Sequence, residues 1–132
     1  MAECDWAILC DYAFLDVGRK MCMIGVFDRV FTASVPSALH HSAVAIKLIG
    51  EPGEEINFRV EIIRPTGGQL ATMEGTASVP EVGAVEMTVT IAGMPLPDFG
   101  LYSLNIHAGT ALLKTVGFLV TQPAQTQPSQ TR

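Results

Sequence analysis

Pro97-Asp98-Phe99-Gly100-Leu101-Tyr102 is the stretch that decides the fold. Its Pro, Asp and Gly form a turn that leads into residues 102–108, where apolar and polar side chains alternate with the period of a half-buried strand. Gly109-Thr110 predicts a tight reversal, and residues 111–120 return as the partner strand. A buried tyrosine needs a packed ring and a hydrogen-bonded hydroxyl. Tyr102 at the start of a strand, with Gly100 before it, therefore predicts the loop-to-strand corner of an immunoglobulin-like sandwich.

The rest of the chain repeats this pattern of short extended segments separated by turns that contain Pro or Gly. Strands are expected over residues 6–13, 21–34, 43–49, 56–62, 70–79, 85–91, 102–108 and 111–120. The alternation breaks within residues 21–34, so Gly25 or Asp28 is expected to mark a bulge or a change of sheet. The weaker segment 70–79 carries a charge and suits an edge strand. About eight strands and no helix predict an all-β, antiparallel two-sheet sandwich with Greek-key wiring.

The length of 132 residues fits one domain. We expect the sandwich to span residues 1–120, and we expect residues 121–132, which hold no core-forming side chain larger than Ala, to be a flexible polar tail. No apolar run approaches the roughly 20 residues of a membrane helix. Residues 1–5 lack the basic start of a secretory signal. These observations predict a cytoplasmic protein without membrane insertion.

Charge and cysteine content argue against nucleic acid as a partner and against a zinc site. The net charge is −5 and the eight basic residues are scattered, which argues against nucleic acid, since phosphate contacts need clustered Lys and Arg. The three cysteines, Cys4, Cys10 and Cys22, match no zinc framework and cannot all pair within one chain. We interpret them as reduced core or near-surface thiols, with a disulfide between neighbouring strands as the alternative in an oxidising compartment.

The candidate chemical groups do not form a site in the sequence pattern. His40 and His41 are adjacent, and adjacent strand residues point to opposite faces, so both cannot ligate one metal. Ser103 and His107 share a strand face but lie four residues apart, too far for a nucleophile and its base. The sequence therefore predicts no catalytic residue, no cofactor, no metal site and no enzymatic activity.

Four short motifs carry a resemblance to a known family. They are Cys10-Asp11-Tyr12-Ala13, Gly18-Arg19-Lys20, Ile24-Gly25-Val26-Phe27-Asp28 and Gly100-Leu101-Tyr102. Over most of residues 8–120 the chain resembles an uncharacterised family of small bacterial β-sandwich proteins, which open on Cys-Asp-Tyr-Ala and carry a Gly-Val/Ile-Phe-Asp strand. The resemblance implies a bacterial, non-secreted protein, and because the family has no assigned activity it implies no mechanism.

The leading functional hypothesis is a non-catalytic interaction or scaffold module that binds a protein partner through a sheet face or its turn loops. One alternative is a small-ligand or carbohydrate-binding sandwich. Such proteins display aromatic side chains on one sheet face, whereas Trp6, Tyr12 and most Phe are expected at core parity here. A second alternative is a structural subunit of a larger assembly, which the apolar content of 48% favours.

Residues 43–49 give a specific prediction of self-association. Val44, Ile46 and Leu48 have the size to fill the sandwich core, so Ala43, Ala45 and Ile49 are expected to face outward, with Lys47 as their only charged neighbour on the strand. Small residues beside an Ile make a flat apolar surface that another sheet can approach closely. We therefore expect a homo-oligomer that uses Ala43, Ala45 and Ile49. The alternative is that a loop or the tail of the same chain covers them.

Overall fold

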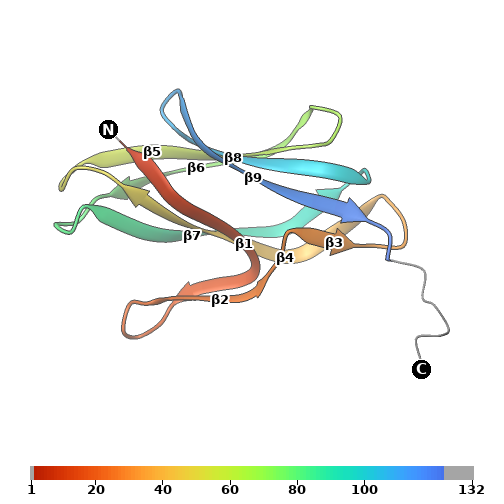
Figure 1. The fold of residues 1–132 in the computed structure, drawn as a ribbon, viewed down its shortest axis with the longest axis horizontal. Helices are drawn as coiled ribbons and strands as arrows, with labels where there is room; N and C mark the ends of the chain where they lie inside the picture. The colour runs from red at the N-terminus through yellow and green to blue at the C-terminus, as the bar shows by residue number, and fades with distance from the viewer. Residues whose placement is uncertain (1, 124–132) are drawn as a thin grey trace.

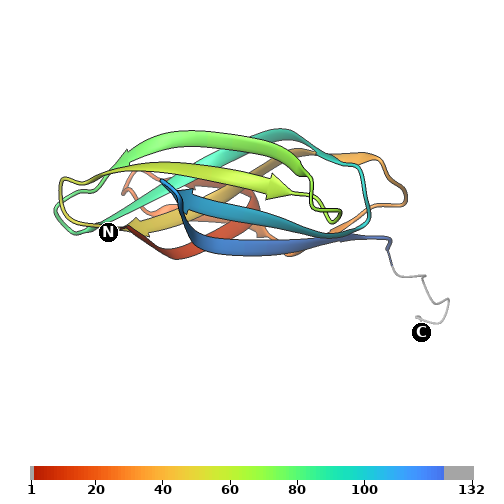
Figure 2. The same ribbon diagram turned by 90° about the horizontal axis from the view of Figure 1, so that it is seen from above.

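Two β-sheets pack face to face in the part of the chain that the computed structural model describes, residues 2–123 (Figure 1). Sheet A has the strand order β2-β1-β4-β7, with bounds Met21–Val26, Glu3–Leu15, Ser37–Ile49 and Ala84–Leu96. Sheet B has the order β3-β9-β8-β5-β6, with bounds Arg29–Phe31, Ala111–Thr121, Gly100–Ala108, Glu55–Ile63 and Gln69–Ser78. Figure 2 looks from above onto sheet B, with the strands of sheet A behind it.

The wiring is that of an immunoglobulin-like Greek-key sandwich. Strands that are neighbours in a sheet are often distant in the chain, as β1 and β4 or β5 and β8 are. The chain crosses between the sheets after β2, β3, β4, β6 and β7. The predicted fold class is therefore confirmed, with nine strands in place of about eight. One pairing departs from the antiparallel prediction, because β3 runs parallel to β9.

The segment 21–34 changes sheet, as its broken alternation predicted. Gly25 has a φ of +72°, and β2 ends one residue later in sheet A. The chain then crosses to sheet B, where the amide of Leu119 donates a hydrogen bond of 2.9 Å to the carbonyl of Asp28 before β3 begins. One expected strand is thus two short strands in different sheets.

The core lies between the two sheets and draws on both. Its fully buried side chains include Tyr102 and Phe118, whose rings stack with centroids 5.1 Å apart. The predicted core parity of β4 is confirmed: Val44, Ile46 and Leu48 all belong to this cluster. Glu74 lies on β6, the edge strand of sheet B, as the charged segment predicted.

The expected facing of the first strand was wrong. Leu9 belongs to the central core, whereas Trp6, Cys10 and Tyr12 do not. Tyr12 is instead half exposed. The alternation along β1 places these residues on one face, as predicted, but that face is the outer side of sheet A. Periodicity assigns residues to a common face and leaves open which of the two faces meets the core.

The hairpin of β1 and β2 folds back along the outer side of sheet A. A straight strand would put Leu15 about 30 Å from Trp6. Yet Leu15 and Arg19 line one depression together with Lys47, and Lys47 is the register partner of Trp6. In Figure 1 the hairpin accordingly lies beneath sheet A, on the side away from sheet B. We call residues 11–26 the hairpin from here on.

The predicted surface of Ala43, Ala45 and Ile49 is not exposed as expected. Ala43 and Ala45 have no exposed area in the single chain, although they lie outside the central core, and Ile49 is 36% exposed. Ala45 lies between Ile8 and Thr88 in register, and both of these side chains are larger than the Ala45 methyl group and shield it from solvent. Neighbouring strands of the same chain cover the two alanines, whereas the alternative considered for this surface was a loop or the tail.

At the C-terminal end, β9 continues to Thr121, one residue beyond the expected domain boundary, and the Gln122 amide donates to the carbonyl of Ala33 at 3.3 Å. The flexible tail predicted for residues 121–132 lies outside the described residues from residue 124 on. Within residues 2–123, no helix is long and apolar enough to cross a membrane.

Candidate functional site

The outer face of the hairpin carries several exposed apolar side chains that lie next to one another. Register pairs Tyr12 with Ile24 and Phe14 with Cys22, so these side chains lie on one face, and Val26 follows opposite Cys10. Tyr12, Phe14, Ile24 and Val26 are 51%, 46%, 56% and 62% exposed. Scattered exposed apolar residues are ordinary, whereas these neighbours form one exposed apolar patch on a short hairpin. We call these four residues the hairpin face.

One set of contacts fixes the base of the hairpin on the sandwich, and another closes its turn. The Tyr12 ring stacks on the imidazole of His41 with centroids 4.4 Å apart, and His41 Nδ1 lies 2.7 Å from the carbonyl of Asp11. At the other end, Asp16 accepts a hydrogen bond of 2.9 Å from the amide of Lys20 and closes the turn. His41 therefore has a structural partner in the hairpin.

The outer face of sheet B is polar and differs in character from the hairpin face. His107 Nε2 lies 3.1 Å from the carboxylate of Glu61, and Thr115 donates to the side-chain carbonyl of Asn105 at 2.8 Å. The hydrogen bond from His107 holds the pKa of Glu61 below its ordinary value. His107 Nδ1 is buried without a hydrogen-bond partner among the described residues. These groups brace β5, β8 and β9.

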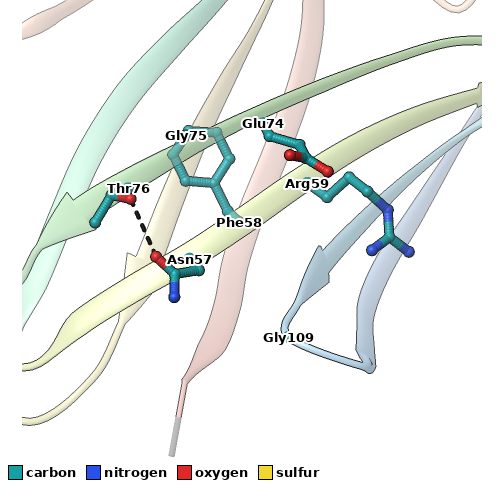
Figure 3. Close-up of a pocket in the computed structure, with 7 residues that line it drawn as sticks. All are labelled: Asn57, Phe58, Arg59, Glu74, Gly75, Thr76 and Gly109. Atoms are coloured by element: carbon teal, nitrogen blue, oxygen red, sulfur yellow. Dashed lines mark hydrogen bonds between the residues drawn. The ribbon is translucent and has the colours of Figure 1, made fainter.

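A shallow depression of about 370 Å³ lies beside this polar face (Figure 3). Thr76 donates to Asn57 at 3.0 Å across the strand pair, and the ring of Phe58 lies over Gly75. Arg59 extends from the same strand, with Glu74 opposite it in register. The depression is open and combines one cation with one carboxylate, so it could take a small polar ligand but has no reactive pair.

Tyr102 and Gly100 lie in the turn of residues 97–102. The Tyr102 hydroxyl donates to the carbonyl of Asp98 at 2.8 Å and accepts from the Asp98 amide at 2.9 Å. The carboxylate of Asp98 in turn accepts from Arg64 Nε and Nη2, both at 2.9 Å. Gly100 has a φ of +127°, and a Cβ there would lie 3.0 Å from Pro65. How much these contacts stabilise the corner stays a prediction.

The cysteines carry no paired or activated chemistry. All three are free thiols. Burial raises the pKa of Cys4 and of Cys10, so both favour the protonated, unreactive form. Among residues 2–123, no group of three or more His, Cys, Asp or Glu side chains could hold a metal ion.

Sequence reasoning named Ala43, Ala45 and Ile49 and missed the hairpin face. The signal was present, because Tyr12 and Phe14 alternate on one strand and Ile24 and Val26 on the next, with a Gly-containing turn between them. A two-stranded hairpin of that composition is apolar on both faces, and only one face can pack against the core of the same chain.

Comparison with known proteins identifies a family and no activity. No curated protein matches the chain significantly. Among solved structures, an immunoglobulin-like protein from Pseudomonas aeruginosa aligns with 91% of this chain and 96% of its own, at 15% identity and a TM-score of 0.45. A family model described as "Family of unknown function (DUF6941)" matches residues 5–121, nearly the whole described structure. The resemblance inferred from the four motifs is thus confirmed, and the chain belongs to this family of unknown function.

Proposed function

We propose that the protein is a non-catalytic interaction module that docks a protein partner on the hairpin face. The observation that carries the proposal is the set of Tyr12, Phe14, Ile24 and Val26, each about half exposed and adjacent in register. Aromatic and branched side chains clustered on a rigid support are typical of the centres of protein interfaces. Only 16% of the residues are charged, which also suits a protein that has part of its surface covered by a partner.

The support of the hairpin favours binding without rearrangement. Tyr12 is held by its stack on His41, and the hairpin tip rests near Lys47, so the face is fixed before a partner arrives. A preformed surface lowers the entropic cost of association. A catalytic reading finds less support, because the buried thiols favour the protonated form.

The experiment is capture from the native host with the tagged chain, followed by binding of the purified partner. Phe14→Lys is the test variant, and Leu112→Lys is the matched control, since Leu112 is 55% exposed on sheet B. We expect wild type and the control to bind the recovered protein, whether another protein or an untagged copy of this chain. Loss of binding for Phe14→Lys should exceed about tenfold. A partner bound equally by all three proteins, or none at all, would overturn the proposal.

A second candidate is the binding of a small polar ligand, which the depression at Asn57, Arg59 and Glu74 favours. A planar guanidinium beside amide and hydroxyl groups suits an organic anion. The two candidates separate cleanly. A ligand in the depression would be lost in Arg59→Ala and retained in Phe14→Lys.

A further inference from the structure

The hairpin has a second unusual feature besides its apolar face, which is the free edge of β2. Sheet A ends at β2, which pairs with β1 alone. Edge strands expose unpaired backbone groups, and proteins protect them with charged residues, prolines or short lengths. The six residues of β2, Met-Cys-Met-Ile-Gly-Val, contain neither a charge nor a proline.

The other three edge strands are protected, which makes β2 the exception among the described strands. The strand β3 has three residues and starts at Arg29. The strand β6 carries Glu74 along its length. The strand β7 carries Glu86 and Pro95. An unprotected edge next to an exposed apolar face is the arrangement that pairs with another strand.

We propose that β2 pairs with β2 of a second copy, antiparallel and about a two-fold axis, so that the two hairpins form one four-stranded sheet. The inference rests on the proposed function, since it names the partner of the hairpin face. A two-fold interface uses the same patch on both subunits. Pairing at β2 would place the two hairpin faces side by side and partly cover Ile24 and Val26, which lie on the edge strand itself, through cross-strand contacts.

Charge supports the antiparallel direction. The charged residues at the hairpin tip are Asp16, Arg19 and Lys20, with a net charge of +1. Those at the opposite end of the hairpin are Asp11, Asp28 and Arg29, with a net charge of −1. Antiparallel pairing brings the tip of one copy to the opposite end of the other, so that unlike charges meet, whereas parallel pairing would bring like charges together.

The first test is sedimentation equilibrium of the full chain. We expect a reversible monomer–dimer equilibrium for wild type, a dissociation constant raised at least about tenfold by Ile24→Lys, and an unchanged constant for Leu112→Lys. Far-ultraviolet circular dichroism and melting show that each variant is folded. A wild type that stays monomeric at about 100 µM, or a dimer that Ile24→Lys leaves intact, would overturn the inference.

Two further measurements read the strand pairing itself. Lys20→Glu and Asp28→Lys should each weaken the dimer several-fold, and the double variant should restore it, because the exposed charges then meet in swapped order. Hydrogen exchange should show that the outward-facing amides of residues 21–26, which do not bond to β1, are protected in the dimer and unprotected in Ile24→Lys. A dimer without this protection would use another surface. A monomer that still binds a different protein through Phe14 would refute the dimer and leave the proposed function standing.

Discussion

The Tyr102 hydroxyl makes two hydrogen bonds to the backbone of Asp98, and the Tyr102 ring stacks on Phe118. We expect Tyr102→Phe to lower the free energy of unfolding by about 1 kcal/mol, because both bonds are lost while the ring remains. Tyr102→Ala should cost about 3–5 kcal/mol, because it also removes the buried ring. Urea and thermal unfolding measure both. An alanine variant with the melting curve of wild type would remove the corner role.

The stability of the protein at alkaline pH is a second, independent test of the role of Tyr102. Burial raises the pKa of Tyr102 above its ordinary value of 10.0. The folded state thus favours the neutral phenol, and its contribution is complete below pH 10 and is lost as pH rises toward the folded pKa. Wild type should therefore lose stability relative to Tyr102→Phe above about pH 10. Parallel urea curves at neutral and alkaline pH decide this.

Single residues were predictable where the constraint is local. Tyr102 follows a Pro-Asp-Phe-Gly turn, and its partner Asp98 is four residues away. Arg64, which binds the same Asp98, is 34 residues away and leaves no trace in the periodicity. The burial of Ala43 and Ala45 likewise depends on distant parts of the chain, because strands β1 and β7 flank both residues in register.

At the scale of elements, Gly25 lies at the bend where the chain leaves sheet A for sheet B. Its φ is +72°, and a Cβ there would clash with the carboxyl group of Asp11. Gly25→Ala should lower the free energy of unfolding by about 1–2 kcal/mol through backbone strain, with a further loss from the clash. Denaturant unfolding measures the total.

Gly93→Ala is the matched control for that experiment, since Gly93 has a φ of +69° and a Cβ there would meet nothing within 4 Å. The difference between the two variants isolates the contact with Asp11, and Asp11→Ala should recover it in the Gly25 variant. Equal costs at the two glycines would mean that Asp11 does not hold the bend. The sequence indicated a bulge at Gly25 or Asp28, but its period could not show that the hairpin adds a third layer.

At the scale of the whole molecule, the sandwich is closed without residues 124–132. The last described contacts are the pairing of Thr121 with Phe31 and the bond from Gln122 to Ala33. Deletion of residues 124–132 should leave the melting temperature unchanged, because these residues offer no large apolar side chain. Scanning calorimetry of the two chains checks it. A drop of several degrees would mean that this segment packs on the protein.

Fold class followed from the sequence because turns and alternation recur along the whole chain. The parallel pairing of β3 with β9 did not, since three residues are too few to show a period and their partner lies some ninety residues away. The exposure of the hairpin face and the burial of residues 43–49 could not be predicted from the sequence either. Both segments are apolar on two sides, and tertiary packing alone decides which is covered.

The pairing of β3 with β9 has a consequence for synthesis on the ribosome. Residues 29–31 are made early, yet their partners are residues 119–121. Sheet A can assemble once β7 has emerged, but one edge of sheet B must wait for the last described strand. During that interval the nascent chain presents an apolar hairpin and an incomplete sheet together, which is when it would most need a chaperone.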